Sequence, residues 1–426
     1  MKKDVRVVVT GMGIICPLGV GLDWVWNRLI SGESGISSLP SIFENFKFPC
    51  KAIGQIPAGT GAGLFDIERW CNSKDQRRMD RFISLGIAAA LMALDDAGWS
   101  PKTPQEKEYT GVSVGAGIGG LPKIEENSVA LHNEGFRRVS PFFVPSSLIN
   151  LAAGHIAIRT GACGPNFGPA TACSAGSQGI GQAYETLKSG KANVMIAGGT
   201  ESTVCPIGIA GFASMQALSN FQGDPTQASR PWDKQRDGFV MAEGAGVLVL
   251  ETLDHALKRG AKIYAEVCGF GTSCDAYHIT TPSGLGAQQS MAASLKDAGL
   301  SIADIGYINA HGTSTPLGDT AELKAVEALI EADPSGKARS LKMSSTKSSI
   351  GHALGASGAI EAIFSILALV NKRIPPTLNL QDPEETFIDL VPHTAQSVSE
   401  LQYALSNSFG FGGNNSTLIF GQYKEQ

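Results

Sequence analysis

The chain has 426 residues, of which 43% are hydrophobic and 17% charged, and its formal net charge is −5 at pH 7. This composition allows a large core in two or three domains, and it gives no basis for a general attraction to nucleic acid or to an anionic membrane. The eight cysteines include no CxxC pair, which excludes zinc-ribbon and thioredoxin-type motifs and favours reduced thiols over a disulfide framework.

The first third of the chain predicts strands and helices separated by glycine turns. Residues 5–10 predict a buried first strand that ends at Gly11-Met-Gly13, not a signal peptide. Residues 75–98 predict one long helix that Gly98 closes, and residues 109–115 predict a second strand. The longest apolar run, residues 362–370, is too short to span a membrane, so we expect a soluble protein.

Residues 115–120 match the pattern GxGxxG, but a dinucleotide site is not favoured. That site needs a helix opening at the glycines and an acidic residue about twenty positions further on. Here Pro122 follows at once, and the later region offers Arg137 and Arg138 instead. We interpret the segment as a glycine turn that lets the backbone approach another surface.

Cys173 lies in a run of small residues, Pro169-Ala-Thr-Ala-Cys173-Ser-Ala-Gly, just before a helical pattern that ends near Gly190. A thiol at a helix N-terminus can have its pKa lowered from about 8.5 to roughly 3.5–7.5, which makes it a nucleophile. Most free cysteines are instead small buried hydrophobes. The residues alone leave both interpretations open.

A second glycine-rich turn, at residues 351–358, also opens an apolar helix with the same spacing. Short continuous apolar segments at 193–197 and 244–250 are typical of strands buried on both faces, so the class is α/β with a largely parallel sheet. The two turns indicate two copies of one α/β unit, whose helix N-termini would meet at a pseudo-twofold axis.

Two histidines stand at the ends of predicted elements. His311 follows a strand and precedes Gly-Thr-Ser-Thr-Pro, a run typical of a binding loop, and His352 lies in the second glycine-rich turn near Lys347. A lone histidine is more often a hydrogen-bonded structural residue, and that interpretation is kept for His132, His155, His255 and His393.

Four ordered motifs carry a family resemblance: Thr171-Ala-Cys173-Ser-Ala-Gly, Asn309-Ala-His311-Gly-Thr-Ser-Thr-Pro, Lys347-Ser-Ser-Ile-Gly-His352 and Asn407-Ser-Phe409-Gly-Phe411-Gly-Gly. Over its whole length the chain resembles the condensing enzymes, most closely the elongating β-ketoacyl-acyl carrier protein synthase II family of fatty acid synthesis. The resemblance implies a thiolase-like fold of duplicated α/β halves in five αβαβα layers, with the halves at residues 1–260 and 261–426. It also implies a cytoplasmic homodimer.

The resemblance assigns roles to particular residues. Cys173 takes the acyl chain as a thioester, while His311 and His352 promote decarboxylation of malonyl-carrier protein and stabilise the enolate. Lys347 and Glu361 resemble the pair that orders the second histidine. The backbone N–H groups of Cys173 and Phe411 form the oxyanion hole, and Phe411 gates the acyl pocket.

The remaining assignments concern substrate and partner. Thr313 and Thr315 hydrogen-bond the phosphopantetheine arm, Ile118 and Phe212 line the acyl pocket, and Phe409 belongs to the substrate-binding set. Acyl carrier protein, loaded with acyl or malonyl groups, is the implied partner, and a basic patch docks it: Lys74, Arg77 and Arg78. A solvated helix start is the alternative interpretation of that patch.

Three alternatives compete with this expectation. A type II polyketide ketosynthase shares the catalytic residues and is poorly separated by sequence. A non-catalytic chain-length partner subunit lacks the nucleophile, so Cys173 argues against it. A thiolase needs a second cysteine near the C-terminus, and no cysteine follows Cys274. No metal or organic cofactor is expected, because decarboxylation itself supplies the carbanion.

Overall fold

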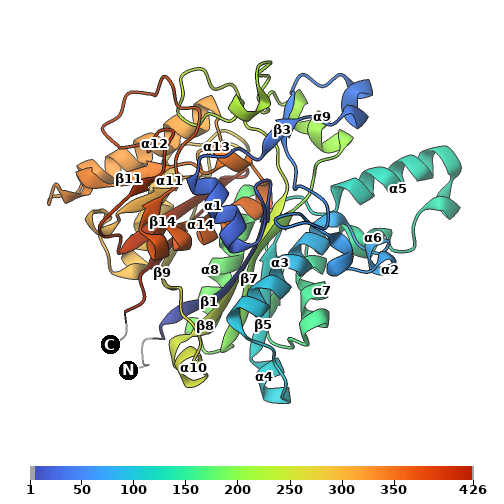
Figure 1. Ribbon diagram of the computed structural model, residues 1–426, viewed down its shortest axis with the longest axis horizontal. Helices are drawn as coiled ribbons and strands as arrows, with labels where there is room; N and C mark the ends of the chain where they lie inside the picture. Colours follow the sequence, from blue (N-terminus) through green and yellow to red (C-terminus); the bar gives the residue numbers. More distant parts are fainter. Residues whose placement is uncertain (1–4, 425–426) are drawn as a thin grey trace.

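The computed structural model describes residues 5–424 (Figure 1). The elements up to residue 258 are β1 Val7–Cys16, β2 Gly19–Val20, α1 Leu22–Ile30, β3 Ile36–Ser38, β4 Ala52–Gly54, α2 Ser73–Gln76, α3 Arg81–Ala97, α4 Pro104–Glu108, β5 Thr110–Gly115, α5 Leu121–Glu134, α6 Phe143–Ser147, α7 Leu151–Thr160, β6 Asn166–Phe167, α8 Ala175–Lys188, β7 Val194–Glu201, α9 Pro206–Ser214, β8 Gly244–Thr252 and α10 Leu253–Lys258. Those that follow are β9 Ala265–Cys274, α11 Leu285–Ala298, β10 Tyr307–Asn309, α12 Pro316–Glu331, β11 Lys342–Ser344, α13 Lys347–Ile350, α14 Ser357–Asn371, β12 Arg373–Ile374, β13 Gln396–Ser397, β14 Tyr403–Gly410 and β15 Asn414–Gly421.

One large sheet runs through the molecule in the order β11-β10-β14-β15-β9-β1-β8-β7-β5-β6. On one side, β1 pairs antiparallel with β8, β8 pairs antiparallel with β7, β7 pairs parallel with β5, and β5 pairs parallel with β6. On the other side, β9 pairs antiparallel with β15, β15 pairs antiparallel with β14, β14 pairs parallel with β10, and β10 pairs parallel with β11. The two series repeat the same strand order and directions, which confirms the predicted duplication. The expected largely parallel sheet is wrong, because only the two outermost pairings of each series are parallel and the strands between them are antiparallel. They join where β1 and β9 pair over three residues.

Helices form three layers around the two halves of this sheet. In the middle, α8 and α14 pack against each other, α8 on β5 and β7 and α14 on β14 and β8 (Figure 1). On the outer faces, α3 packs on β1 and β8, and α11 packs on β9 and β15. The layers are therefore helix, sheet, helix, sheet, helix, as the resemblance implied.

The N-termini of α8 and α14 meet in the central layer, where small residues allow close approach. A Cβ atom at Gly176 would lie 2.8 Å from the backbone nitrogen of Ala359, so only glycine fits there. This contact brings the turn before α8, with Cys173, against the turn before α14, which follows His352. The predicted meeting of the two helix N-termini is confirmed.

Two expectations for the first third of the chain are corrected. The first strand does not end at Gly11 but runs from Val7 to Cys16, because its glycines serve packing and not a turn. A Cβ atom at Gly11 or Gly13 would lie 2.2 or 2.0 Å from a backbone oxygen of α3. The helix predicted over 75–98 is two helices, α2 and α3, because the Asp80 side chain accepts the Phe82 N–H and caps a new start.

One further expectation is corrected in the central layer. The helical stretch Leu354–Asn371 has 18 residues and is apolar enough, by length and composition, to cross a membrane. It is longer than the expected run at 362–370 because small residues extend it toward its N-terminus. Since 89% of the stretch is buried inside the protein, it is a core helix. All eight cysteines are free thiols.

Candidate active site

A cavity of about 460 Å³ opens between the two halves, and most of its exposed lining is apolar. Cys173, His311, His352, Phe409 and Phe411 all line it, although they come from distant parts of the chain. So do four further predicted residues, which are Ile118, Phe212, Thr313 and Thr315. The fold thus brings the predicted nucleophile, histidines and substrate residues to one hollow.

Cys173 sits in a 3₁₀ turn, Ala172–Ser174, directly before α8. The preceding Ala172 has a φ of 50°, a left-handed conformation that is strained for alanine and turns the thiol toward the cavity side. The backbone N–H groups of Cys173 and Phe411 both lie within hydrogen-bonding reach of the sulfur. These are the two donors assigned to the oxyanion hole, and they converge from opposite halves.

The thiol does not have the lowered pKa that its position before a helix predicts. Burial raises the pKa of Cys173 to about 12, and the positive charge of Lys347 and the two backbone N–H groups offset this only in part. The expectation from the helix terminus is therefore wrong for the free protein, because desolvation of the thiolate outweighs the helix and backbone dipoles. Cys173 is a neutral thiol at pH 7.

His311 and His352 pack edge to face beside the cavity, with ring centroids 5.3 Å apart and an angle of 86° between the rings. Burial lowers the pKa of both imidazoles well below 6.5, and the charge of Lys347 lowers it further. Both rings are therefore neutral at physiological pH, so each holds one N–H. His352 Nδ1 lies 3.0 Å from the Ser357 hydroxyl, and the backbone N–H groups of His311 and Gly312 donate to Glu322.

Lys347 and Glu361 form an ion pair in which both side chains are fully buried. Glu361 is on α14 and Lys347 begins α13, so the pair ties together the two ends of the turn that holds His352. Burial raises the pKa of the Glu361 carboxyl, and the Lys347 ammonium opposes that rise. The sequence-based expectation of a buried, partnered carboxylate at Glu361 is met.

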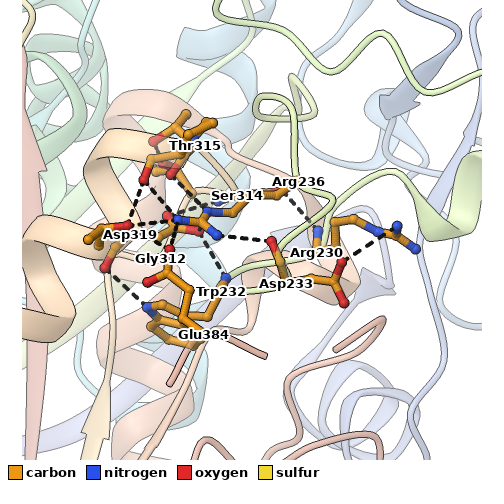
Figure 2. Close-up of polar contacts among 12 residues, drawn as sticks. Arg230, Trp232, Asp233, Arg236, Gly312, Ser314, Thr315, Asp319 and Glu384 are labelled. Carbon is orange, nitrogen blue, oxygen red and sulfur yellow. Dashed lines mark hydrogen bonds and ion pairs between the residues drawn. The ribbon is translucent and has the colours of Figure 1, made fainter. Parts of the chain in front are cut away.

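The turn after His311 is held from below by a buried polar network, which Figure 2 shows. The hydroxyls of Thr313 and Thr315 are 3.0 Å apart, and the Ser314 N–H donates to Asp319. The Arg236 guanidinium donates to the backbone oxygen of Thr315 and pairs with Asp319. The sequence alone gave no sign of this network. Its members become visible only when residues some eighty positions apart meet.

Phe411 lies on the loop between β14 and β15, where Gly412 and Gly413 have φ values of 82° and 73°. Phe411 is 36% exposed, and the Gly412 N–H donates to the Ile279 oxygen of the 275–283 segment. Asp275 holds that segment, since its carboxylate accepts hydrogen bonds from the Ser283 N–H and the Asn415 amide. Phe409 lies inside, with its ring centroid 5.7 Å from that of His311.

The glycine turn at residues 115–120 opens α5, so Pro122 does not prevent a helix there. Its backbone nitrogens nevertheless bind no external anion, because the buried carboxylate of Glu201 fills the position. The N–H groups of Gly117, Ile118 and Gly119 donate to Glu201 over 2.6, 3.1 and 2.9 Å. The turn does approach another surface, as predicted, but the residue that fixes it was missed, since Glu201 has no signal in the sequence beyond its place at the end of a strand.

The predicted docking residues lie apart from this cavity. Lys74 is in α2, and Arg77 and Arg78 follow it; all three side chains are exposed. Arg78 lies over the ring of Phe142 at 4.8 Å, and none of the three lines the cavity.

The duplicated five-layer fold and its central cavity, with one cysteine, two backbone donors and two neutral histidines, define a thiolase-like protein built for covalent acyl transfer. Sequence models of the β-ketoacyl synthase N-terminal and C-terminal domains match residues 4–256 and 264–381. The chain belongs to the β-ketoacyl synthase family.

Several relatives match along nearly the whole chain. A 3-oxoacyl-[acyl-carrier-protein] synthase 2 of Rhizobium meliloti (strain 1021) is 53% identical, with 98% of this chain and 99% of the relative covered. The mitochondrial 3-oxoacyl-[acyl-carrier-protein] synthase of Arabidopsis thaliana is 45% identical, covering 97% and 93%. Among solved structures, a β-ketoacyl synthase from Burkholderia phymatum STM815 has a TM-score of 0.89 at 33% identity, covering 99% and 100%. A type II polyketide ketosynthase in complex with its acyl-carrier protein has a TM-score of 0.88 at 31% identity, with the same coverage.

Proposed function

We propose that this protein elongates fatty acids by two carbons, condensing malonyl-acyl carrier protein with an acyl chain held on Cys173. The observation that carries the proposal is the convergence of the Cys173 sulfur and the backbone N–H groups of Cys173 and Phe411 in an apolar cavity that also holds His311 and His352. Names of relatives at 42–53% identity agree with it.

In the first half-reaction, the Cys173 sulfur attacks the carbonyl carbon of an acyl thioester on the carrier. The oxygen that becomes negative is stabilised by the N–H groups of Cys173 and Phe411. The carbon–sulfur bond to the carrier breaks, and the proton lost by Cys173 ends on the carrier's thiol. A neutral resting thiol suits this exchange, because the proton has to travel with the leaving group.

In the second half-reaction, the carbon–carbon bond of the malonyl group breaks to give carbon dioxide and an enolate. The enolate oxygen accepts hydrogen bonds from the neutral imidazoles of His311 and His352. If Ser357 donates to Nδ1 of His352, that ring carries its proton on Nε2, the nitrogen free to face the cavity. The enolate carbon then attacks the Cys173 thioester, and the returning thiolate takes up one proton.

Two other functions fit the data less well. A type II polyketide ketosynthase would use the same chemistry, but a type II polyketide ketosynthase among the structural neighbours is 31% identical, well below the 53% of a curated synthase 2 relative. A non-catalytic chain-length partner needs neither a nucleophile nor donors around it. The intact constellation at Cys173 argues against that function.

Acyl carrier protein is the proposed partner, in keeping with a neighbour that was solved bound to its own carrier. We infer that Lys74, Arg77 and Arg78 contact the acidic carrier, since all three are exposed.

We also propose a homodimer. Helix α5 projects from the body of the molecule (Figure 1). This helix and the segment after it carry exposed apolar side chains, which a second copy of the chain would cover: Val129, Leu131, Phe136, Val144 and Leu148.

Three further features complete the proposal. The reaction uses no metal or organic cofactor, because decarboxylation generates the carbanion and backbone donors stabilise the oxyanion. The two halves divide near residue 260, between α10 and the strand at which the topology begins to repeat. The protein works in the cytoplasm, where its thiols stay reduced.

The test is intact-protein mass after incubation with a series of acyl-carrier proteins and then with malonyl-carrier protein. We expect one acyl group on Cys173, discharged as a product two carbons longer. The Cys173→Ala variant should accept no acyl group, and Cys173→Gln should decarboxylate malonyl-carrier protein without condensation. Elongation by Cys173→Ala would refute the assignment of the nucleophile.

A further inference from the structure

Glu201 is a buried carboxylate that the proposed mechanism does not use. It ends β7, its side chain is fully buried, and four backbone N–H groups donate to it. Three come from the glycine turn at Gly117, Ile118 and Gly119 in the first half, and the fourth, at 3.2 Å, is that of Gly355 in the second half. One side chain therefore fastens the glycine turn and links it across the junction of the two halves.

The space around Glu201 admits only this arrangement. A Cβ atom at Gly117 or at Gly355 would lie 2.8 Å from the same carboxylate oxygen, and one at Gly355 would also lie 2.1 Å from the Gly117 nitrogen. Both positions must therefore be glycine for the carboxylate to reach the backbone. Glycine at these positions gives the turn no stiffness of its own, so its shape depends on the hydrogen bonds to Glu201.

Ile118 is the residue whose place this turn decides. Its side chain lines the cavity and packs with the apolar cluster around Cys173, Phe239 and Leu354. Glu201 does not line the cavity and touches no substrate. Its charge also raises the pKa of Cys173, but this effect is the same for acyl chains of every length. An effect of Glu201 on the preference among chain lengths must therefore pass through the backbone that carries Ile118.

The histidines are anchored by other groups. The His352 N–H donates to the Val240 oxygen at 2.7 Å, and its own backbone oxygen accepts the Ala242 N–H at 3.0 Å. The backbone of His311 is held by Glu322. Loss of Glu201 should therefore disturb the acyl pocket more than the site of malonyl decarboxylation.

From this geometry we infer that Glu201 is a positioning residue that sets acyl-chain preference by fixing Ile118 as a rigid wall of the acyl pocket. The inference rests on the proposed function, because it concerns the chain bound to Cys173. It extends that function by assigning the pocket wall to a carboxylate outside the cavity.

The sharpest perturbation is Glu201→Gln, which keeps the size of the side chain. The amide oxygen can still accept from Gly117, Ile118 and Gly355, but the amide NH₂ then faces the Gly119 N–H, and one hydrogen bond is replaced by two opposed donors. The turn loosens at Ile118 without a cavity being created. Glu201→Ala removes all four acceptor contacts and serves as the more severe variant, provided that it folds.

A matched control lies at the other end of the same pair of strands. Glu251 is also fully buried, and it faces Val194 in the β7–β8 ladder, whereas Glu201 faces Gly244. Its partners are Arg259, His255 and Thr10, none of which lines the cavity. Glu251→Gln therefore removes a carboxylate that is as deeply buried as Glu201 but lies away from the acyl pocket.

The experiment measures kcat/KM for condensation with saturated acyl-carrier proteins from short to long, together with the rate of malonyl decarboxylation. For Glu201→Gln we expect the long-to-short ratio of kcat/KM to fall by about fourfold for each methylene that loses its packing against Ile118. Decarboxylation and the short-chain rate should stay within about twofold of the wild type. Glu251→Gln should leave the ratio unchanged.

A double variant tests whether the effect passes through Ile118. In an Ile118→Ala background, Glu201→Gln should cause no further change in the ratio, because the wall is already gone. A ratio that is unchanged or raised in Glu201→Gln, or a fully additive effect in the double variant, overturns the inference. If wild-type protein fails to acylate Cys173 at all, the proposed function itself fails, and the two failures are thereby distinguished.

Discussion

Replacing Arg236 with methionine tests how the turn that carries Thr313 and Thr315 is held. The Arg236 side chain is 4% exposed and lies between two carboxylates, Asp319 and Glu384 (Figure 2). It also donates to the backbone oxygens of Thr315 and Pro316, at 3.2 and 2.8 Å. Methionine fills similar space but supplies no donor.

The magnitude follows from what the substitution leaves behind. Removing one partner of a buried ion pair typically costs 3–5 kcal/mol, and we expect about 3 kcal/mol here. The lower figure applies because burial already raises the pKa of Asp319 to about 7 with Arg236 present. Without the guanidinium that pKa rises further, so Asp319 takes up a proton and avoids a bare buried charge.

The assay combines calorimetric unfolding with steady-state kinetics on acyl- and malonyl-carrier proteins. We expect a lower unfolding midpoint and a raised KM for both carriers, with a smaller change in kcat, since the threonine hydroxyls move while Cys173 keeps its place. Lys234→Ala is the control. Lys234 lies two residues before Arg236 in the chain, but its ion pair with Asp382 is on the surface. If Arg236→Met matches that control in midpoint and KM, the network does not hold the turn.

Three further outcomes follow from the geometry. Gly13→Ala should prevent folding, because the new Cβ would lie 2.0 Å from a backbone oxygen of α3. In Gly154→Ala the nearest atom to the new Cβ is 3.8 Å away, so this variant should be more stable by about 0.5–1 kcal/mol. Soluble yield and calorimetric unfolding compare the two variants. The folded state holds His352 neutral, so below pH 6.5 the unfolded chain binds more protons and the free energy of unfolding falls as the pH falls. In His352→Gln the free energy of unfolding should depend less steeply on pH over this range. An equal pH dependence in the two proteins would contradict the lowered pKa of His352. Thr313→Val should raise KM for carrier-bound substrates severalfold and leave the reactivity of Cys173 toward iodoacetamide unchanged, which mass spectrometry can follow.

The architecture was predictable because its signals are local or repeated. Glycine-rich turns before apolar helices indicated the duplication, and the strand order around β1 and β9 confirms it. Motif spacing brought the Cys173, His311 and His352 segments into one hypothesis, and the cavity contains all three. Their individual catalytic roles stay predictions until tested.

What the sequence did not predict depends on contacts between distant segments. Glu201 and Arg236 act on backbone atoms many residues away, and no periodicity marks such partners. The pKa of Cys173 was misjudged for a similar reason, since a helix N-terminus is visible in sequence but burial of the sulfur is not. Gly11 and Gly13 were read as a turn because a glycine that admits a neighbouring helix looks the same in sequence as one that bends the chain.

The position of β15 has a consequence for when activity can arise during synthesis. Strand β15, residues Asn414–Gly421, lies between β14 and β9 in the interior of the sheet and is the last strand described. The Phe411 amide that faces Cys173 lies three residues before the start of β15. A nascent chain can thus have folded its first half, with Cys173 in place, and still lack the Phe411 N–H that we propose as an oxyanion donor until residues 411–421 leave the ribosome. The proposed acyl transfer is thereby delayed until β15 joins the sheet, and a chain cut short before β15 is left with an open sheet between β14 and β9.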